Sequence, residues 1–443
     1  MPIPFPGELL FGTATSATQI EGRCEGTDWL AFSREAGRVL HGDTPLIACD
    51  HWQRWREDVE LQRSLGLHAH RLSVEWARVE PEEGVFDHAA LERYREEVGA
   101  LRDAGITPMV TLHHFTLPLW IARRGGLCAR ELPRLLERYA ERVAEVLGDL
   151  VELWITLNEP NVVVVLGYLF GLWPPAERGR IDRVLLAHHR LLEAHVRMYR
   201  ALHRVVPRRG RAPQVGVAHH LRVTEPHDPS RVLDWLAAGL QERFFNEGFL
   251  VALEQGRLSR PLDEVMAKLT GFSVREAKGT QDFFGLNYYS RDLVRLGLSR
   301  EGVLERRVPE GADTTDLGWE IYPQGLSDLL LKWGHRLKLP VYITENGLAD
   351  DDDDQRPGFL VRHLAEMARA MEGGVDVRGY FHWSLLDNFE WAEGYAPRFG
   401  LVEVDYETQQ RRPRESAKLY ARIAQERCIP DDVLLAHAPH ARR

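Results

Sequence analysis

Short apolar segments alternate with longer segments of helical period along almost the whole chain of 443 residues. The apolar segments are continuous runs rather than runs that alternate with polar residues, which is typical of strands covered on both faces. They predict eight strands, over residues 8–15, 69–76, 107–114, 151–159, 214–220, 282–290, 340–347 and 377–385.

The segments between these strands have the spacing of amphipathic helices. Leu132, Leu135, Leu136, Tyr139 and Val143 recur at helical intervals, and a similar pattern precedes the last strand. Crossovers of helical length between buried strands require a parallel sheet. Eight such units predict the α/β class and a closed (β/α)8 TIM barrel. A doubly wound nucleotide-binding fold is the alternative, but the turn over residues 13–18 lacks the G-x-G-x-x-G motif.

The chain reads as one domain, because it has no fixed-period repeat, Gly/Ser linker or low-complexity tract. We expect residues 1–443 to form a single barrel, with 429–443 as a loosely held tail. Insertions at 168–180 and 290–319 follow the fourth and sixth strands and should build cleft walls. The acidic run at 350–354 predicts a solvated loop rather than a calcium site, because the D-x-D-x-D-G spacing is missing.

Composition excludes several classes of function. A net charge of −10, with arginines interleaved among acidic residues, argues against nucleic-acid binding. The sequence has no signal-peptide pattern and no apolar run long enough to span a bilayer. The four cysteines are scattered, which fits reduced thiols in the cytoplasm better than a disulfide framework or a zinc site.

Two carboxylates stand at the ends of buried strands. Glu159 follows Asn158 at the end of the fourth predicted strand, and Glu345 precedes Asn346 at the end of the seventh. Burying a carboxylate at the end of an apolar strand costs free energy unless the group is paired or functional. For either glutamate alone, a structural role as a helix cap or ion-pair partner explains the position as well as a catalytic role does. Hydrolysis of a glycosidic bond requires two carboxyl groups, one protonated and one ionised.

The two strand ends resemble the catalytic signatures of family 1 glycoside hydrolases. They read T-L-N-E-P at 156–160 and I-T-E-N-G at 343–347. The resemblance continues from F-G-T-A-T at 11–15 to W-S-L-L-D-N-F-E-W at 383–391 and R-F-G-L-V at 398–402. It covers nearly the whole chain, in the order and approximate spacing of the family.

This resemblance implies a retaining, exo-acting β-glycosidase that hydrolyses β-D-glucosides, and also β-D-galactosides or β-D-fucosides. Glu345 is then the nucleophile and Glu159 the acid/base. We expect an ionised Glu345 to raise the pKa of Glu159, and the glycosyl-enzyme to lower it again. Arg71 should lie beneath Glu345 and keep it ionised, and Tyr289 should donate to it and fix its orientation.

By the same resemblance, the remaining site residues bind the sugar at the non-reducing end. Gln19 and Glu390 each hold adjacent hydroxyls, Asn158 holds the 2-hydroxyl, and Trp383 offers a flat apolar face. The full set of predicted sugar ligands is Gln19, His114, Asn158, Asn287, Tyr289, Trp383, Glu390 and Trp391.

The chain departs from the family pattern beside His114. Alignment on Leu117-Pro118 makes His114 the sugar ligand and His113 a wall or core residue. Phe115 replaces a usual Trp, and Leu127 stands where Trp is frequent, so aromatic surface near the cleft is reduced. These changes leave the preferred glycone and aglycone open.

Three alternatives remain: a transglycosidase, a 6-phospho-β-glycosidase and a catalytically inactive sugar-binding relative. The phospho-specific branch typically has Ser followed by Lys and Tyr where this chain has Glu390, which argues for an unphosphorylated substrate. The expected partner is a small β-glycoside or short oligosaccharide, with no cofactor and no metal; a homo-oligomer is compatible with the sequence.

Overall fold

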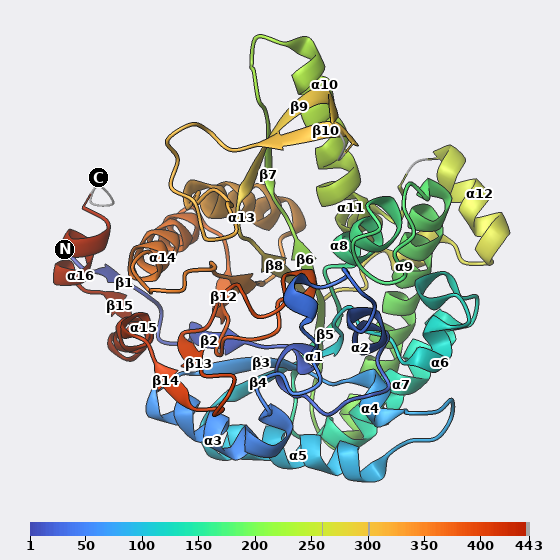
Figure 1. The fold of residues 1–443 in the computed structure, drawn as a ribbon, viewed down its shortest axis with the longest axis horizontal. Coiled ribbons are helices and arrows are strands. Elements are labelled where there is room, and N and C mark those ends of the chain that lie inside the picture. The colour runs from blue at the N-terminus through green and yellow to red at the C-terminus, as the bar shows by residue number, and fades with distance from the viewer. Residues whose placement is uncertain (259, 300–301, 440–443) are drawn as a thin grey trace.

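Eight parallel strands close into a barrel in a computed structural model that describes residues 1–258, 260–299 and 302–439. Neighbouring strands follow the order β11-β12-β2-β3-β4-β5-β6-β8 (Figure 1). The strands are β2 (Leu10–Ala14), β3 (Ala69–Ser73), β4 (Thr107–His113), β5 (Leu153–Asn158), β6 (Gln214–His220), β8 (Phe283–Asn287), β11 (Val341–Asn346) and β12 (Val377–Trp383). Each lies within a predicted range, so the predicted (β/α)8 barrel is confirmed.

Helices surround the barrel (Figure 1), and each turns one apolar face to the strands. In α7, for example, Leu135, Leu136, Tyr139 and Val143 are all buried, as their spacing predicts. The main covering helices are α3 (His51–Ser64), α5 (His88–Asp103), α7 (Leu132–Leu147), α9 (Ile181–Val205), α11 (Gly248–Gln255), α13 (Gln324–Leu337), α14 (Arg356–Glu372) and α15 (Glu415–Glu426).

The segments after β6 and β8 leave the barrel and form a projecting lobe (Figure 1). Strands β7 (Val223–Pro226), β9 (Arg291–Ser299) and β10 (Gly302–Arg307) make a three-stranded sheet in the order β10-β9-β7. Helix α10 (Val232–Gln241) packs on this sheet, and α12 (Arg260–Thr270) follows later in the same insertion. The sequence predicts the insertion after β8, part of which lies outside the described residues, but not the one after β6.

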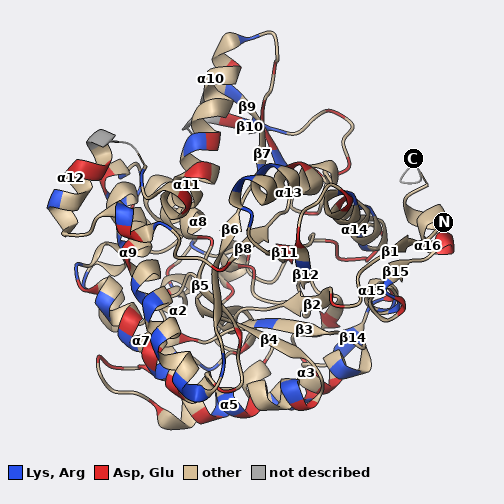
Figure 2. Cartoon of the chain, turned by 180° about the vertical axis from the view of Figure 1, so that it is seen from behind, with Lys and Arg blue, Asp and Glu red and all other residues tan. Residues whose placement is uncertain are grey.

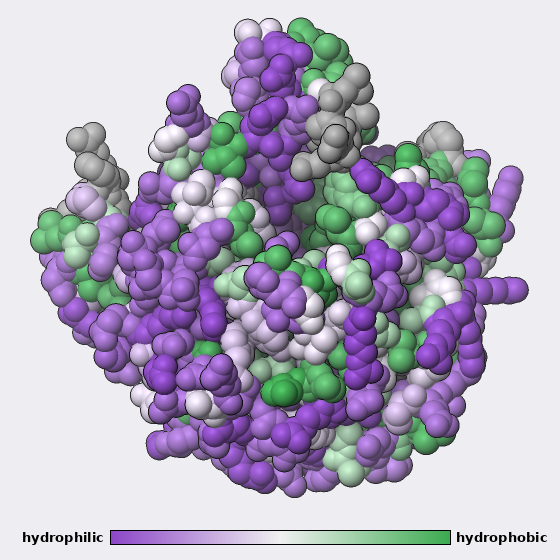
Figure 3. Space-filling view, viewed as in Figure 1, coloured by the Kyte–Doolittle hydropathy of each residue, from purple (hydrophilic) through white to green (hydrophobic). Residues whose placement is uncertain are grey.

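The apolar residues of α10 explain why the insertion after β6 escapes the pattern. Leu233, Trp235, Leu236 and Leu240 are at least half exposed, whereas Asp234 is fully buried. Figure 3 shows apolar side chains gathered on this lobe. Amphipathic helices normally turn their apolar residues toward the core, whereas this helix turns them outward and buries a carboxylate. Hydrophobic periodicity alone therefore does not predict where the helix packs.

The C-terminal segment differs from the loosely held tail that the sequence predicts. Strand β15 (Cys428–Ile429) pairs with β1 (Ile3–Pro4), and α16 (Asp431–His437) follows it. Ile429, Val433 and Leu434 are buried in the core. These three apolar side chains are too few to show a period, yet their burial holds the segment in place. Residues 440–443 of the predicted tail lie outside the described residues.

Charged residues of both signs are interleaved over the outer helices, without a continuous basic stripe in the view (Figure 2). Many pair with neighbours, as Arg95 does with Asp149 and Arg204 with Glu137. Among the described residues, no helix is long and apolar enough to cross a membrane.

Candidate active site

Glu159 and Glu345 both lie at the carboxyl ends of barrel strands. Glu159 follows β5 and begins the short helix α8 (Pro160–Val164), with a left-handed backbone at φ 44°. Glu345 is the next-to-last residue of β11 and pairs in register with Asn287 of β8. Catalytic groups of this fold gather on this face of the barrel. Both carboxyl groups are buried.

Arg71 of β3 is the fully buried cation of the site. Its Nη1 donates to Glu345 Oε1 at 2.6 Å and to the Thr344 carbonyl at 3.1 Å. Its Nη2 donates to Asn158 Oδ1 at 2.6 Å, and its Nε donates to Thr111 Oγ1 at 3.1 Å. One guanidinium therefore ties together the ends of β3, β4, β5 and β11.

Tyr289 holds the other oxygen of Glu345, because its hydroxyl donates to Oε2 at 2.6 Å. Burial nevertheless raises the pKa of Glu345 to about 7, against the attraction of Arg71. Arg71 lowers this pKa, as expected of a neighbouring cation, and the expectation that it keeps Glu345 ionised at neutral pH stays a prediction. The cation offsets only part of the desolvation in this closed place.

Glu159 is held through one oxygen only. Its Oε1 accepts from Asn287 Nδ2 at 2.8 Å and lies 2.9 Å from His220 Nδ1. Its Oε2 has no hydrogen-bond partner within the described part of the chain. Burial raises the pKa of Glu159, but the charge that His220 carries when protonated, together with the bonds from His220 and Asn287, lowers it below its usual value.

The two carboxyl groups interact electrostatically, so their titrations are linked. A proton on one favours the ionised form of the other. With His220 protonated, the expected rise in the pKa of Glu159 is absent, because that positive charge and the bonds from His220 and Asn287 outweigh the effect of burial. Which carboxyl holds the shared proton thus depends on the charge of His220.

Two asparagines fix the geometry between these carboxyl groups. Asn287 accepts from Thr344 Oγ1 at 2.6 Å, which turns its amide nitrogen toward Asn158 Oδ1, at 3.1 Å, and Glu159. Asn158 has its amide nitrogen 3.1 Å from His114 Nε2. His114 Nδ1 has no partner among the described residues and lies beside the aromatic wall.

The far end of the site is built around Gln19. Its amide donates to Asn388 Oδ1 at 2.9 Å and to Glu390 Oε2 at 3.2 Å. Its own carbonyl accepts from Ser16 Oγ at 2.6 Å, so the amide orientation is set. Burial, together with the charges of Glu345 and Glu159, raises the pKa of Glu390 to about 8. Glu390 can therefore donate as well as accept hydrogen bonds near neutral pH.

Aromatic rings line the wall between these two ends. The His114 ring is stacked with Trp383 at 5.9 Å and with Trp391 at 6.2 Å between centroids. Phe115 packs edge-on against Trp391 at 5.3 Å and against Trp173 at 4.9 Å. Trp173, from the predicted insertion at 168–180, thus adds aromatic surface beside Phe115 and Trp391.

Gly347 allows the aromatic wall to approach the end of β11. A Cβ atom at this position would lie 1.7 Å from the Trp383 carbonyl oxygen. A side chain larger than hydrogen would therefore displace Trp383 or Glu345. The glycine of the I-T-E-N-G segment is required by this close approach.

Every site residue predicted from the sequence lies in this one network or its aromatic wall, and their roles stay predictions. Sequence reasoning missed Asn388, which meets Gln19, and Trp173. It also missed His220, although that residue ends a predicted strand as Glu159 does. His220 could have been predicted, because polar residues at the carboxyl ends of barrel strands face the site.

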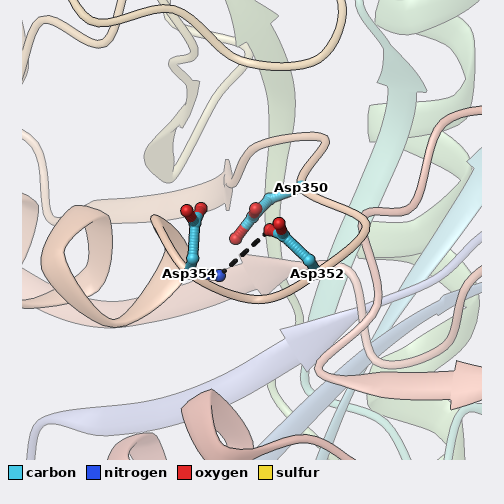
Figure 4. Close-up of side chains that lie close together, drawn as sticks. All are labelled: Asp350, Asp352 and Asp354. Carbon is cyan, nitrogen blue, oxygen red and sulfur yellow. Dashed lines mark hydrogen bonds between the residues drawn. The ribbon is translucent and has the colours of Figure 1, made fainter.

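The acidic run after β11 is only partly the solvated loop that the sequence predicts (Figure 4). Asp352 and Asp354 are exposed, but Asp350 is buried and accepts from the backbone N–H groups of Gln355 and Arg356. Asp350 thus caps α14. Asp350, Asp352 and Asp354 each offer one oxygen within 4.8 Å of the others, but exposed acidic groups commonly gather without an ion.

Replacing Tyr289 with Phe should raise the pKa of Glu345 further. The ring stacked on His220 is kept, whereas a hydrogen bond to the charged form is lost. Loss of such a bond should raise the pKa by about one unit. Carbon-13 NMR titration of the labelled glutamate carboxyls measures it. Tyr288→Phe is the control, because the Tyr288 hydroxyl bonds to the Tyr322 carbonyl; equal shifts in both variants would contradict the assignment.

Comparison with known proteins gives a consistent result. The model of glycosyl hydrolase family 1 matches residues 1–428. β-Glucosidase A of Thermotoga maritima is 36% identical over 451 residues, covering 96% of this chain and 99% of the relative. A β-glucosidase of an Agrobacterium species is 34% identical, covering 95% of both chains.

Solved structures agree. A family 1 β-glucosidase from Thermotoga maritima superposes with a TM-score of 0.90 at 35% identity, covering 97% of this chain and all of the other. A β-glycosidase from Pyrococcus horikoshii superposes with a TM-score of 0.88 at 39% identity, covering 99% of this chain and 98% of the other. Other structures of the Thermotoga enzyme hold glucoimidazole or deoxynojirimycin. The resemblance predicted from the motifs is confirmed: the chain is a glycoside hydrolase and belongs to glycosyl hydrolase family 1.

Proposed function

We propose that this protein is a retaining, exo-acting β-glycosidase that hydrolyses β-D-glucosides, with Glu345 as nucleophile and Glu159 as acid/base. One observation carries the assignment. Both oxygens of Glu345 are held by Arg71 and Tyr289, whereas Glu159 Oε2 has no hydrogen-bond partner in the part of the chain that the structure describes. A nucleophile needs a fixed, anionic carboxylate, and an acid needs an oxygen free to hand over a proton.

In the first step, a carboxylate oxygen of Glu345 forms a bond to the anomeric carbon. The bond from that carbon to the leaving oxygen breaks, and the proton of Glu159 passes to that oxygen. The product is an ester between Glu345 and the sugar. Glu345 has lost its charge, so the repulsion that favours protonation of Glu159 is removed.

In the second step, Glu159 accepts a proton from water, and the water oxygen attacks the anomeric carbon. The ester bond to Glu345 breaks and the electron pair returns to that carboxylate. Two inversions give net retention. The same network serves both steps, because Arg71 and Tyr289 stabilise the carboxylate that is released.

The proposed glycone is an unmodified glucose-like sugar. The pair Gln19 and Glu390 can bridge adjacent hydroxyls, and the rings of Trp383 and His114 offer an apolar wall. The relatives reported above are named β-glucosidases. We extend the proposal to β-D-galactosides and β-D-fucosides as secondary substrates, and to a cytoplasmic setting, because all four cysteines are free thiols.

Labelling tests the proposed nucleophile. A fluorinated, slow-releasing β-glucoside should modify the wild-type protein at Glu345 alone, as read by peptide mass spectrometry. Glu345→Gln should fold normally, escape labelling and lose activity by several orders of magnitude, since it cannot form the ester. Glu393→Gln, which changes an acidic residue next to the site, is the control. Modification at another carboxylate would overturn the assignment.

A phosphorylated substrate should be rejected. A phosphate near Glu390 would add negative charge to a buried place where burial and the charges of Glu345 and Glu159 already raise the pKa of Glu390. Arg398 cannot compensate, because its Nη1 is directed to the Val404 carbonyl at 3.1 Å and to Asp387 at 3.4 Å. We expect kcat/KM for a 6-phospho-β-glucoside to be more than about a hundredfold lower than for the plain glucoside. Comparable values would contradict the proposed substrate, and Glu390→Ser should narrow the difference.

A further inference from the structure

A chain of hydrogen bonds leads from Glu159 into the projecting lobe. His220, the last residue of β6, is buried with Nδ1 2.9 Å from Glu159 Oε1. Its other ring nitrogen, Nε2, accepts from Arg222 Nε at 3.0 Å. The ring is held in place by a parallel Tyr289 and an edge-on Phe245, each with its centroid 5.7 Å away.

Arg222 is itself fixed by the lobe. Its Nη1 donates to Asp292 Oδ1 at 2.9 Å, and Asp292 Oδ2 accepts from Gln241 Nε2 at 2.6 Å. The backbone N–H of Arg222 donates to Asn246 Oδ1, and the Asn246 amide donates to the Arg222 carbonyl. These bonds fix the position of Arg222, so its contact with His220 is a defined part of the structure and not that of a freely moving surface side chain.

The chemistry of arginine sets the state of this histidine. A guanidinium stays protonated and can only donate hydrogen bonds. The Nε2 atom of His220 must then offer its lone pair, and the single ring proton lies on Nδ1. This neutral tautomer donates to Glu159 Oε1 without bringing a positive charge beside it. Oε2, for which the described residues supply no hydrogen-bond partner, is left as the oxygen that carries the catalytic proton.

We propose that Arg222 is a positioning residue, which holds His220 as the neutral Nδ1–H tautomer and thereby keeps the shared proton on Glu159 rather than on Glu345. This inference rests on the proposed acid role of Glu159. Without Arg222, the Nε2 atom could take up a proton, and an imidazolium would pair with the Glu159 carboxylate. The acid would then be ionised when the substrate arrives.

Several charged or titratable groups face the Glu159–His220 pair from other elements. Of these, Arg222 is the one that contacts Nε2, and a charge on His220 is a main influence that lowers the pKa of Glu159. The groups include Arg71 on β3, Glu345 on β11, Tyr289 after β8, Glu390 after β12, Arg222 between β6 and β7, and Asp292 on β9, which Arg306 of β10 also faces.

The test compares Arg222→Met/Asp292→Asn with Asp292→Asn alone. The paired change avoids a buried Asp292 that has lost the guanidinium bound to it, and Asp292→Asn keeps the donor to His220. The alkaline limb of kcat/KM on a glucoside with a poor leaving group reports the acid. We expect this limb to move to lower pH by about 1–3 units in the double variant and to stay in place in the control. An unmoved limb in the double variant would overturn the inference.

The same comparison in a His220→Asn background shows whether Arg222 acts through the protonation state of His220 or through a general change in structure. Asn in place of His220 can still donate an amide N–H toward Oε1, but it cannot gain a proton. In His220→Asn, adding Arg222→Met/Asp292→Asn should therefore leave the alkaline limb where His220→Asn has it. A shift of the same size in both backgrounds would show that Arg222 does not act through the histidine.

Nitrogen-15 NMR of wild-type His220 tests the same inference without any variant of Arg222. We expect a neutral ring protonated at Nδ1 from pH 5 to 8, and an imidazolium at pH 7 would overturn it. The labelling experiment on Glu345 does not depend on Arg222. If Glu345 is labelled but the alkaline limb of the double variant does not move, only the proposed role of Arg222 is rejected. Labelling at another residue would reject the proposed function.

Discussion

The guanidinium of Arg71 lies at the floor of the site with no exposure to solvent. A buried cation without partners costs several kcal/mol, so the groups around it must supply acceptors in the right places. Glu345, Thr344, Asn158 and Thr111 do so from three other strands. The need to supply acceptors to Arg71 fixes the position of the nucleophile and the orientation of Asn158. It also ties together the strands on this side of the barrel.

The same requirement separates the two carboxyl groups into two roles. Glu345 is the partner of the cation and of the Tyr289 hydroxyl, so it is held at both oxygens. Glu159 contacts an amide and an imidazole at one oxygen, and its other oxygen has no hydrogen-bond partner among the described residues. Because burial disfavours two negative charges in this place, the pair holds one proton near neutral pH, and the surrounding donors determine where it lies.

The barrel was predictable because its strands are buried on both faces and therefore appear as continuous apolar runs, such as Leu153–Asn158. The site followed from motif resemblance, and its residues do meet at the carboxyl ends of those strands. Two features were beyond the sequence. Helix α10 directs its apolar residues outward, and the tail is held by three buried side chains that show no period. The role of His220 depends on a contact with Arg222, two residues later, that no strand or helix pattern encodes.

The division of roles between the carboxyl groups is tested most directly by Glu159→Ala supplied with azide and an activated aryl β-glucoside. Azide can enter the space left by the Glu159 side chain and attack the ester on Glu345. We expect restored turnover and a β-glucosyl azide, identified by proton NMR of the anomeric position. An α-glucosyl azide would mean that the missing residue was the nucleophile, and would contradict the account.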